Sequence, residues 1–301
     1  MALNRSKLKA TELTFVDTNN IEHIVHDFER QGLVARTKDQ LKSALSKLGS
    51  NNGTICIVDS IDIDGDLTIP ENISLKFFNG GILNVLTQDV SNENVGTGDG
   101  STTEFSLAYS PVLENSETIY VDGVEQTRNT DYTINYETGV ITFTSAPANG
   151  VAIIANYTRR FKLTINGGID AGLFQIFDGD GVVTGNPKIE AVYPEWFGAR
   201  GDGITDDTEA IQRAVNFYSH VRLRKATYGI AELLISNGDF ILKGSGNDMD
   251  QTLLKYIGTS GDYVLKIEAS GGKRIRITDV GIDGLNLAKG VWINNASWTI
   301  Y

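Results

Sequence analysis

Residues 193–215 read YPEWFGARGDGITDDTEAIQRAV and place an aromatic, glycine-rich segment directly before a predicted helix. Asp206 is a good N-cap residue, and Glu209 three positions later completes a capping box. The apolar residues that follow recur at helical spacing and form one stripe: Ala210, Ile211, Ala214, Val215 and Tyr218. An amphipathic helix is therefore expected to begin near Asp207 and to pack one face against an apolar surface.

Composition limits the classes of protein to which this chain can belong. Its 301 residues include 32 glycines and 5 prolines, a balance typical of tight turns between short strands rather than of a disordered linker. The formal net charge of −12 argues against general binding to nucleic acids or anionic membranes, because both require a positive field. The length allows one to three domains with sizeable cores.

The first 35 residues predict little regular structure. A short helix is expected near residues 20–30, because apolar residues recur there at helical spacing. The segment contains no continuous apolar run suited to a signal peptide, and no run in the chain approaches the length of a membrane span. We therefore expect synthesis in a cytoplasm without a secretion signal, and no membrane insertion.

A second helix is followed by a series of short strands. Thr37 opens this helix, Gln40 completes its capping box and Gly49 ends it. Apolar runs separated by turns then predict strands at residues 54–58, 67–69, 73–78 and 81–86. Cys56, the only cysteine, lies in the first of these runs, so we predict an inert core residue and no intrachain disulfide.

Residues 95–158 differ from their surroundings in charge and in pattern. They contain eight acidic residues and one base, Arg128, which gives a net charge of −7. Their apolar runs alternate with polar residues, and hairpin turns are predicted at Asp122-Gly123 and Thr138-Gly139. Because the short-strand pattern resumes at Phe161, the chain is expected to divide into two parts here. Residues 36–94 and 159–195 would form one β-rich anchoring module, and residues 95–158 an inserted antiparallel β domain.

After the helix at 207–219, short strands separated by Gly, Asn, Asp and Ser recur at short intervals. This pattern predicts the first coils of a right-handed parallel β-helix over residues 196–301, with a β-sandwich as the alternative. The first coil of a solenoid exposes apolar interior and strand edges, and an amphipathic helix across that end covers both. The predicted structural cap consists of Trp196, Phe197, Asp206, Glu209, Ile211 and Val215.

Three phrases of the sequence carry a resemblance to a known family. Residues 196–215, with TYGI at 227–230 and ILKGSG at 241–246, closely resemble the opening of the pectate-lyase-like β-helix of bacteriophage tailspikes. INGGIDAGLFQIFDG at 165–179, running into EAVYPEWFGA, resembles the segment before that β-helix. The insertion resembles a small β module of phage tail fibres and spikes. The resemblance covers about residues 36–301.

The resemblance implies a mainly β homotrimer that belongs to a virion tail and is made in the cytoplasm of the bacterial host. Residues 1–35 would attach to a phage tail or baseplate protein, and the β-helix would recognise a host surface polysaccharide. In the alternative, the full-length protein is a polysaccharide depolymerase, either a lyase or a glycoside hydrolase, with its active site beyond residue 301. The compactness and negative charge of 95–158 suggest that this block docks another spike or tail protein.

Two pairs of residues are candidates for contact with sugars. Asp279 and Asp283 have the residue type that glycosidic hydrolysis requires, but each lies beside or near a glycine, where aspartate commonly forms turns. We favour the turn interpretation. Trp292 and Trp298 could stack on sugar rings or pack within the fold, and the sequence does not choose between these roles. No catalytic residue is predicted.

No cofactor or metal site is predicted either. Asp62, Asp64 and Asp66 alternate like the first half of a calcium loop. The twelfth position, counted from Asp62, is Ile73 instead of the bidentate glutamate that such a loop requires. We therefore expect the three aspartates to be turn and strand-edge carboxylates.

Overall fold

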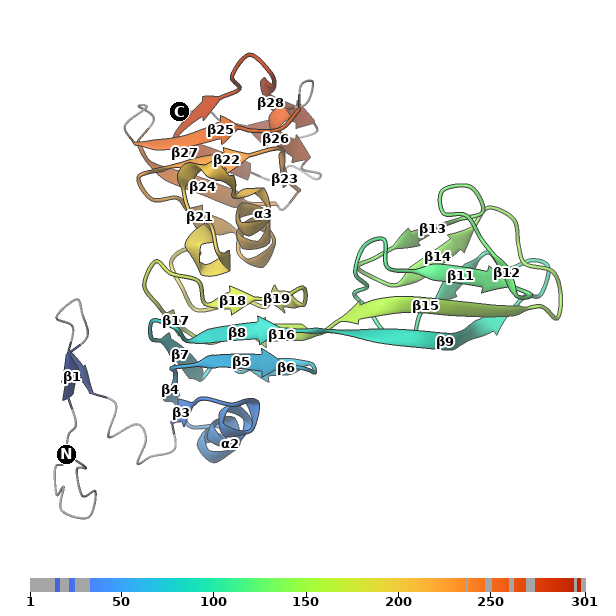
Figure 1. Cartoon of the computed structure of the whole chain (residues 1–301), viewed down its shortest axis with the longest axis horizontal. Helices are drawn as coiled ribbons and strands as arrows, with labels where there is room; N and C mark the ends of the chain where they lie inside the picture. Colours follow the sequence, from blue (N-terminus) through green and yellow to red (C-terminus); the bar gives the residue numbers. More distant parts are fainter. Residues whose placement is uncertain are drawn as a thin grey trace.

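Figure 1 shows a stack of short strands from which an antiparallel β module projects sideways. The structure is a computed structural model, and it describes residues 14–16, 22–24, 33–236, 238–246, 251–259, 263–268, 274–294 and 297–298. Helix α2 lies at the bottom of the stack and β28 lies near its top, so successive segments form successive layers.

The bottom of the stack is covered by helix α2, Lys38–Leu48. Its N-cap Thr37 accepts a hydrogen bond from the backbone N–H of Gln40 at 3.3 Å, and Gly49 ends the helix. Leu41 is fully buried on the side that faces the first strands. The helix predicted between Thr37 and Gly49 is confirmed, because capping and the apolar stripe agree on its position.

Above α2, short strands form three parallel sheets, which we call the neck (residues 33–86 and 161–192). The first sheet contains β3 (Val34–Ala35), β4 (Gly53–Ile57), β7 (Ile73–Phe77) and β17 (Ile169–Asp170); the second contains β5 (Ser60–Ile63), β8 (Ile82–Val85) and β18 (Phe177–Asp178); the third contains β6 (Leu67–Ile69), β16 (Lys162–Ile165) and β19 (Val182–Thr184). Leu67 pairs with Leu163, and Leu83 pairs with Phe177. Two segments far apart in the sequence therefore lie side by side, strand against strand.

The projecting part, residues 87–160, is called the side module here (Figure 1). Its strands are β9 (Thr87–Thr97), β10 (Glu104–Ser106), β11 (Thr118–Val121), β12 (Val124–Glu125), β13 (Tyr132–Asn135), β14 (Val140–Phe143) and β15 (Ala152–Arg160). These strands pair antiparallel with one another in two sheets, and the long β9–β15 pair runs from Thr87–Arg160 to Thr97–Ala152. The pairing begins at residue 87, before the boundary expected at residue 95. The sequence did not indicate the start of β9, because a mostly polar strand gives no apolar pattern.

Residues 193–298 form the upper stack. Its elements are η2 (Pro194–Phe197), β20 (Asp202–Asp206), α3 (Thr208–Phe217), β21 (His220–Arg222), β22 (Ala226–Ile230), β23 (Leu233–Ile235), β24 (Phe240–Gly246), β25 (Thr252–Tyr256), β26 (Tyr263–Glu268), β27 (Arg274–Asp283), β28 (Lys289–Asn294) and β29 (Ser297–Trp298). The strands pair in parallel, as where Tyr228 lies opposite Leu254 and Leu265 opposite Val291. The expectation of a mainly β fold with parallel sheets is confirmed, and the parallel pairing argues against the β-sandwich alternative.

The helix expected near residues 20–30 is wrong for the part of that range that the structure describes. Glu22–Ile24 is strand β2, and it pairs antiparallel with β1, Thr14–Val16. Spacing alone favoured a helix, but antiparallel pairing with the neighbouring strand β1 determined the conformation of these residues. The rest of residues 1–32 lies outside the described residues.

Candidate functional site

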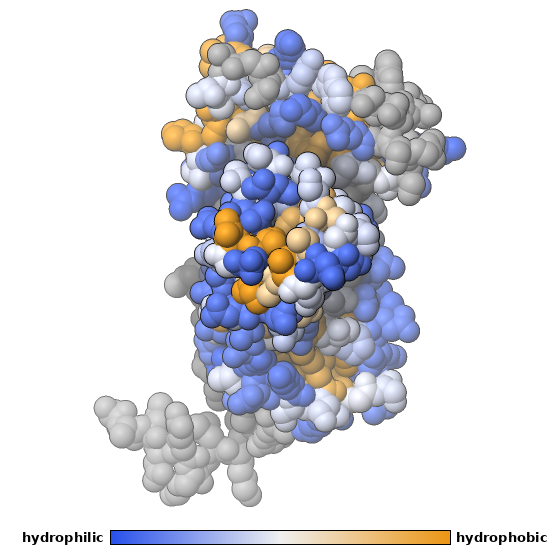
Figure 2. All heavy atoms as spheres, turned by 90° about the vertical axis from the view of Figure 1, so that its right-hand side faces the viewer, coloured by the Kyte–Doolittle hydropathy of each residue, from blue (hydrophilic) through white to orange (hydrophobic). Residues whose placement is uncertain are grey.

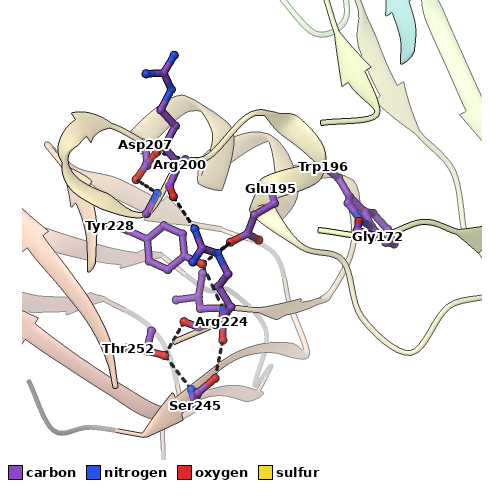
Figure 3. Close-up of polar contacts among 11 residues, drawn as sticks. Gly172, Glu195, Trp196, Arg200, Asp207, Arg224, Tyr228, Ser245 and Thr252 are labelled. Atoms are coloured by element: carbon purple, nitrogen blue, oxygen red, sulfur yellow. Dashed lines mark hydrogen bonds and ion pairs between the residues drawn. The ribbon is translucent and has the colours of Figure 1, made fainter. Parts of the chain in front are cut away.

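The neck and the upper stack meet at residues 193–217, where the predicted cap lies. Trp196, Phe197, Ile211 and Val215 are each 5% exposed or less and belong to one hydrophobic cluster that continues into the neck. Figure 3 shows the indole of Trp196 turned toward Gly172, whose carbonyl accepts its Nε1–H at 2.9 Å. The structure thus brings the four apolar cap residues together at this junction.

Three phenylalanines fill the centre of the junction. The ring of Phe177, from the neck, lies 5.2 Å from that of Phe197 and 5.8 Å from that of Phe217, the last residue of α3. Phe197 and Phe217 are themselves 5.9 Å apart. The guanidinium of Arg213 lies 5.3 Å from the centre of the Phe197 ring. Packed aromatic pairs stabilise beyond simple burial, so the two parts share one core.

The polar half of the predicted cap differs from expectation. Helix α3 begins at Thr208, and Asp207 rather than Asp206 occupies the N-cap position. Asp206 instead accepts a hydrogen bond from the N–H of Thr208 at 2.9 Å. The N-cap predicted at Asp206 is wrong by one residue, because Asp206 ends strand β20 and the helix starts after Asp207. The Asp207 side chain makes no capping hydrogen bond, and its carboxylate bonds to another segment instead.

Asp207 holds the loop before β20. Its two carboxylate oxygens accept the backbone N–H groups of Arg200 at 2.7 Å and Gly201 at 3.0 Å, as Figure 3 shows for Arg200. Its own N–H donates to the carbonyl of Gly229 at 2.7 Å. The residue is 1% exposed, and burial raises the pKa of its carboxyl above the ordinary value, against the opposing effect of these hydrogen bonds.

A second buried carboxylate joins η2 to the sheet above it. Glu195 is 4% exposed, and its Oε1 accepts hydrogen bonds from Arg224 Nε and from the Tyr228 hydroxyl, each at 2.7 Å (Figure 3). The same arginine donates to the carbonyl of Arg200 at 2.5 Å. Burial is the main cause that raises the pKa of the Tyr228 hydroxyl, so it remains a proton donor.

The polar contacts continue upward from Arg224. Its carbonyl accepts the Thr252 hydroxyl at 2.9 Å, and Thr252 Oγ1 in turn accepts the N–H of Ser245 at 2.8 Å. Thr252 is fully buried at the start of β25. We call Glu195, Arg224, Tyr228 and Thr252 the junction cluster. It connects η2, β22 and β25 through the Oε1 atom of Glu195, whereas Glu195 Oε2 is buried without a hydrogen-bond partner among the described residues.

The junction cluster was missed by the sequence analysis. The available signal was Glu195 itself, a charged residue directly before Trp196, which was predicted to be part of the cap. A carboxylate in such a position requires donors, and an arginine or tyrosine from the following strands is a natural source. The cluster contains one carboxylate, Glu195, which accepts hydrogen bonds from Arg224 and Tyr228. This geometry suits a structural connection between the neck and the upper stack.

The candidate carboxylates lie elsewhere and have local partners. Asp279 is exposed and has a left-handed backbone with φ 60°, and Asp283 accepts the N–H of Leu285 at 2.9 Å. Both features are typical of turn residues, as we favoured. Trp292 is half-buried, with its ring 6.3 Å from that of Tyr263, whereas the Trp298 side chain lies outside the described residues.

The three alternating aspartates do not converge on one point. Asp62 accepts a hydrogen bond from Asn84 at 2.7 Å, Asp64 pairs with Lys38, and Asp66 accepts the N–H of Lys162 at 2.9 Å. In the part of the chain that the structure describes, no group of three or more His, Cys, Asp or Glu residues is placed to hold a metal ion.

Two other features bear on function. Cys56 is 1% exposed, as expected of a core residue, and burial raises the pKa of its thiol to about 11. Within the described ranges, no helix combines the length and the apolar character needed to cross a membrane.

Comparison with known proteins gives a limited similarity to phage proteins. No family model matches the chain. A capsule K30/K69-specific depolymerase of Klebsiella phage K64-1 is 39% identical over 66 residues, which are 21% of this chain and 8% of that protein. The chain is therefore distantly similar to a phage capsule depolymerase.

Two solved phage tailspikes also match over part of their length. The Gp54 tailspike of Acinetobacter baumannii phage AP22, solved with a capsular saccharide, is 10% identical with a TM-score of 0.18; 94% of this chain and 49% of that chain are covered. Tailspike gp49 of Pseudomonas phage LKA1 is 12% identical with a TM-score of 0.16. That match covers 81% of this chain and 41% of the tailspike chain. Such low TM-scores carry no argument about fold or function. The chain spans about half or less of the length of these proteins.

Proposed function

We propose that this chain is a bacteriophage tailspike structural protein that contributes to recognition of a host surface polysaccharide. The observation that carries the proposal is the 39% identity to a phage capsule depolymerase over 66 residues. The parallel layers of the upper stack are consistent with it, because an elongated stack of strands offers a long side surface to a polymer.

In this proposal the parts of the chain have separate roles. Residues 196–301 are the first coils of a right-handed parallel β-helix, with α3 as its cap. Residues 36–94 with 159–195 form the anchoring module, and residues 1–35 attach it to a tail or baseplate protein of the virion. The protein assembles as a homotrimer, and residues 95–158 dock a further spike or tail protein.

The proposal is tested with purified capsular polysaccharides. The chain is immobilised and exposed to K30 and K69 capsules, the types in the name of the similar depolymerase, and to unrelated capsules as controls. We expect saturable binding to at least one capsule, and a mass in sedimentation equilibrium three times the 32.7 kDa of one chain. Failure to bind any capsule in a broad panel contradicts polysaccharide recognition, and a monomer at micromolar concentration contradicts the trimer.

A second candidate function is polysaccharide cleavage, favoured by the name of the similar protein, a depolymerase. Glycosidic hydrolysis requires two carboxyl groups on either side of the bond, and the junction cluster does not supply such a pair. We therefore expect this chain to bind capsule without releasing new reducing ends or unsaturated sugars. Release of either product by residues 1–301 would replace the structural proposal with an enzymatic one.

A further inference from the structure

A groove of about 790 Å³ opens on the neck where the strands of its third sheet end. Thr68 lies in β6, Asn166 follows β16, and residues 186–190 follow β19, so the groove crosses three paired strands. Tyr218, directly after α3, completes the lining from the upper stack. The volume lies within the range of about 300–1,000 Å³ that is typical of ligand sites. The groove therefore runs across successive layers of the stack.

The groove presents accessible polar groups with hydrogen-bonding capacity to spare. Asn186 and Thr68 are exposed, and Asn166 is half-buried. The Oδ1 atom of Asn166 accepts the backbone N–H of Asn186 at 3.1 Å, which orients the Asn166 amide. Among the described residues, Asn166 Nδ2, the Asn186 side-chain amide and the Thr68 hydroxyl have no hydrogen-bond partner. These donors and acceptors are available to a ligand that enters from solvent.

An aromatic ring held in a fixed position lies among these polar groups. Tyr218 is half-buried, and its hydroxyl donates to the carbonyl of Ile189 at 3.0 Å. Ile189 and Pro187 line the groove as well and extend its apolar surface. A sugar ring has apolar C–H faces and a border of hydroxyl groups. An aromatic face next to free amides matches both parts of such a ring.

The charged side chains at the groove are paired with one another. Lys188 lies 3.4 Å from Glu71, and Arg222 lies 3.2 Å from Glu190. Lys188, Glu71 and Glu190 line the groove, so the cation that the lining contributes already has an anionic partner. Recognition here would therefore depend on hydroxyl groups rather than on the charge of an acidic polymer.

We propose that this groove binds consecutive sugar residues of the host polysaccharide, with the polymer lying along the stack. Thr164 pairs with Thr184, and Asn166 and Asn186 each come two residues later, so the two amides occupy successive layers. Paired strands lie about 4.8 Å apart, which is close to the length of one pyranose residue in an extended chain. Successive amides can thus meet successive sugar residues. The inference rests on the proposed polysaccharide recognition and assigns a site to it.

The outward end of the side module fits a polysaccharide less well. Figure 2 shows apolar side chains gathered there, with hydrophilic residues around them. Val124, in β12 of this module, is 64% exposed. An apolar patch with a polar border is typical of a protein interface, whereas a polymer rich in hydroxyl groups requires hydrogen-bonding partners along its length.

The first test measures how tightly variants of the full chain bind K30 and K69 capsular polysaccharides and any other capsule that the unchanged chain binds. Asn186→Ala removes an exposed amide that has no partner in the fold, and Asn52→Ala removes an exposed amide elsewhere on the neck. We expect a loss of affinity of about three- to tenfold in the first and less than about twofold in the second. Equal affinities of the two variants overturn the proposal.

A second pair of variants tests the aromatic ring. Tyr218→Leu removes the ring, whereas Tyr218→Phe keeps the ring and removes only the hydrogen bond to Ile189. We expect about a tenfold loss of affinity for the leucine variant and less than about twofold for the phenylalanine variant. Equal losses would show that the ring does not contact the sugar, which overturns the proposal.

A third variant fills the groove and keeps its other polar groups. Thr68→Trp places a large side chain at an exposed strand position that tolerates aromatic residues, and should weaken capsule binding more than about tenfold. Conversion of a trimer to a monomer by this change, measured by sedimentation equilibrium, would show that a second copy occupies the groove. That result overturns the proposal.

The salt dependence of binding and the unchanged chain complete the test. Because hydroxyl contacts are not screened, raising NaCl from about 50 mM to about 500 mM should lower the affinity less than about twofold, and a loss of more than about tenfold overturns the proposal. If the unchanged chain and all groove variants bind a capsule equally, the groove is not the site, although polysaccharide recognition stands. If the unchanged chain binds no capsule, both proposals are wrong.

Discussion

The neck is joined to the upper stack and to the side module in two different ways. Toward the upper stack, one hydrophobic cluster continues across the junction, and Glu195 adds buried polar contacts to it. Toward the side module, the neck core stops, and a separate cluster built around residues such as Ile119 and Ile153 begins. The comparison indicates that the neck and the upper stack unfold together, whereas the side module is a cooperative unit of its own.

The side module is attached to the neck by backbone pairing and by side-chain contacts of Arg159 and Arg160, whose Nε donates to the carbonyl of Asp180 at 2.5 Å. The β9–β15 pair leads directly into the neck, where the N–H of Phe161 donates to the carbonyl of Leu86 at 3.1 Å. The guanidinium of Arg159 lies 4.3 Å from the ring centre of Tyr109 and 4.5 Å from that of Phe161. These contacts orient the module without merging its core with that of the neck.

The largest effect is expected from removing a central aromatic ring. Phe177→Ala takes away a fully buried ring that contacts Phe197 and Phe217, and should lower the free energy of unfolding of the stack by about 3–5 kcal/mol. Ile153→Ala is the matched change in the side module, and it should lower the free energy of unfolding of that module by about 2–5 kcal/mol. Differential scanning calorimetry should show two transitions, each moved by one variant. A single transition moved by both contradicts independent units.

The next effect tests the junction cluster. Arg224→Ala leaves Glu195 buried without its charged partner and should lower the free energy of unfolding by about 2–3 kcal/mol. The control is Arg222→Ala, which breaks a more exposed pair with Glu190 and should cost less than about 1 kcal/mol. Denaturant unfolding of both proteins measures the difference. Equal losses would mean that the buried carboxylate does not tie the junction.

Acid should weaken similar turns in both regions. Asp202 accepts the N–H groups of Ile204 and Thr205, which lowers the pKa of its carboxyl to about 2. Asp99 of the side module accepts those of Thr102 and Ser101, and its pKa is also lowered. Because the folded pKa lies below the unfolded value of about 3.9, this stabilisation is present above about pH 4 and is lost toward pH 2.

The acid prediction is measured by NMR titration of the two carboxyl groups. Asp202→Asn should reduce the loss of stability between about pH 4 and pH 2 in the stack transition alone, and Asp99→Asn in the side-module transition alone. Titration of either carboxyl near its ordinary value would show that its turn is not held as described.

The smallest change in stability is expected for Arg159→Ala, together with a clear change in mobility. The variant removes the side chain stacked between Tyr109 and Phe161 and should lower the free energy of unfolding by about 1 kcal/mol or less. Small-angle scattering should show a broader range of module orientations. Lys162→Ala, a neighbouring cation in β16, is the control and should leave the scattering profile unchanged.

Local sequence signals determined the elements that depend on neighbouring residues. Thr37, Gln40 and Gly49 fixed the first helix, and the apolar stripe of α3 fixed the face that is buried, because helical contacts lie within four residues. Alternating and glycine-rich patterns likewise indicated a mainly β fold with parallel sheets and placed Trp196, Phe197, Ile211 and Val215 in a core. These features follow from side-chain pattern and backbone propensity alone.

Only the tertiary structure decided the contacts between distant segments. The sequence did not show that Asp207 would bind the N–H groups of Arg200 and Gly201 instead of capping α3, or that Glu195 would meet Arg224 and Tyr228. Each of these depends on which donors folding brings to a buried carboxylate, and burial makes the energy of such pairing sensitive to three-dimensional position rather than to spacing along the chain.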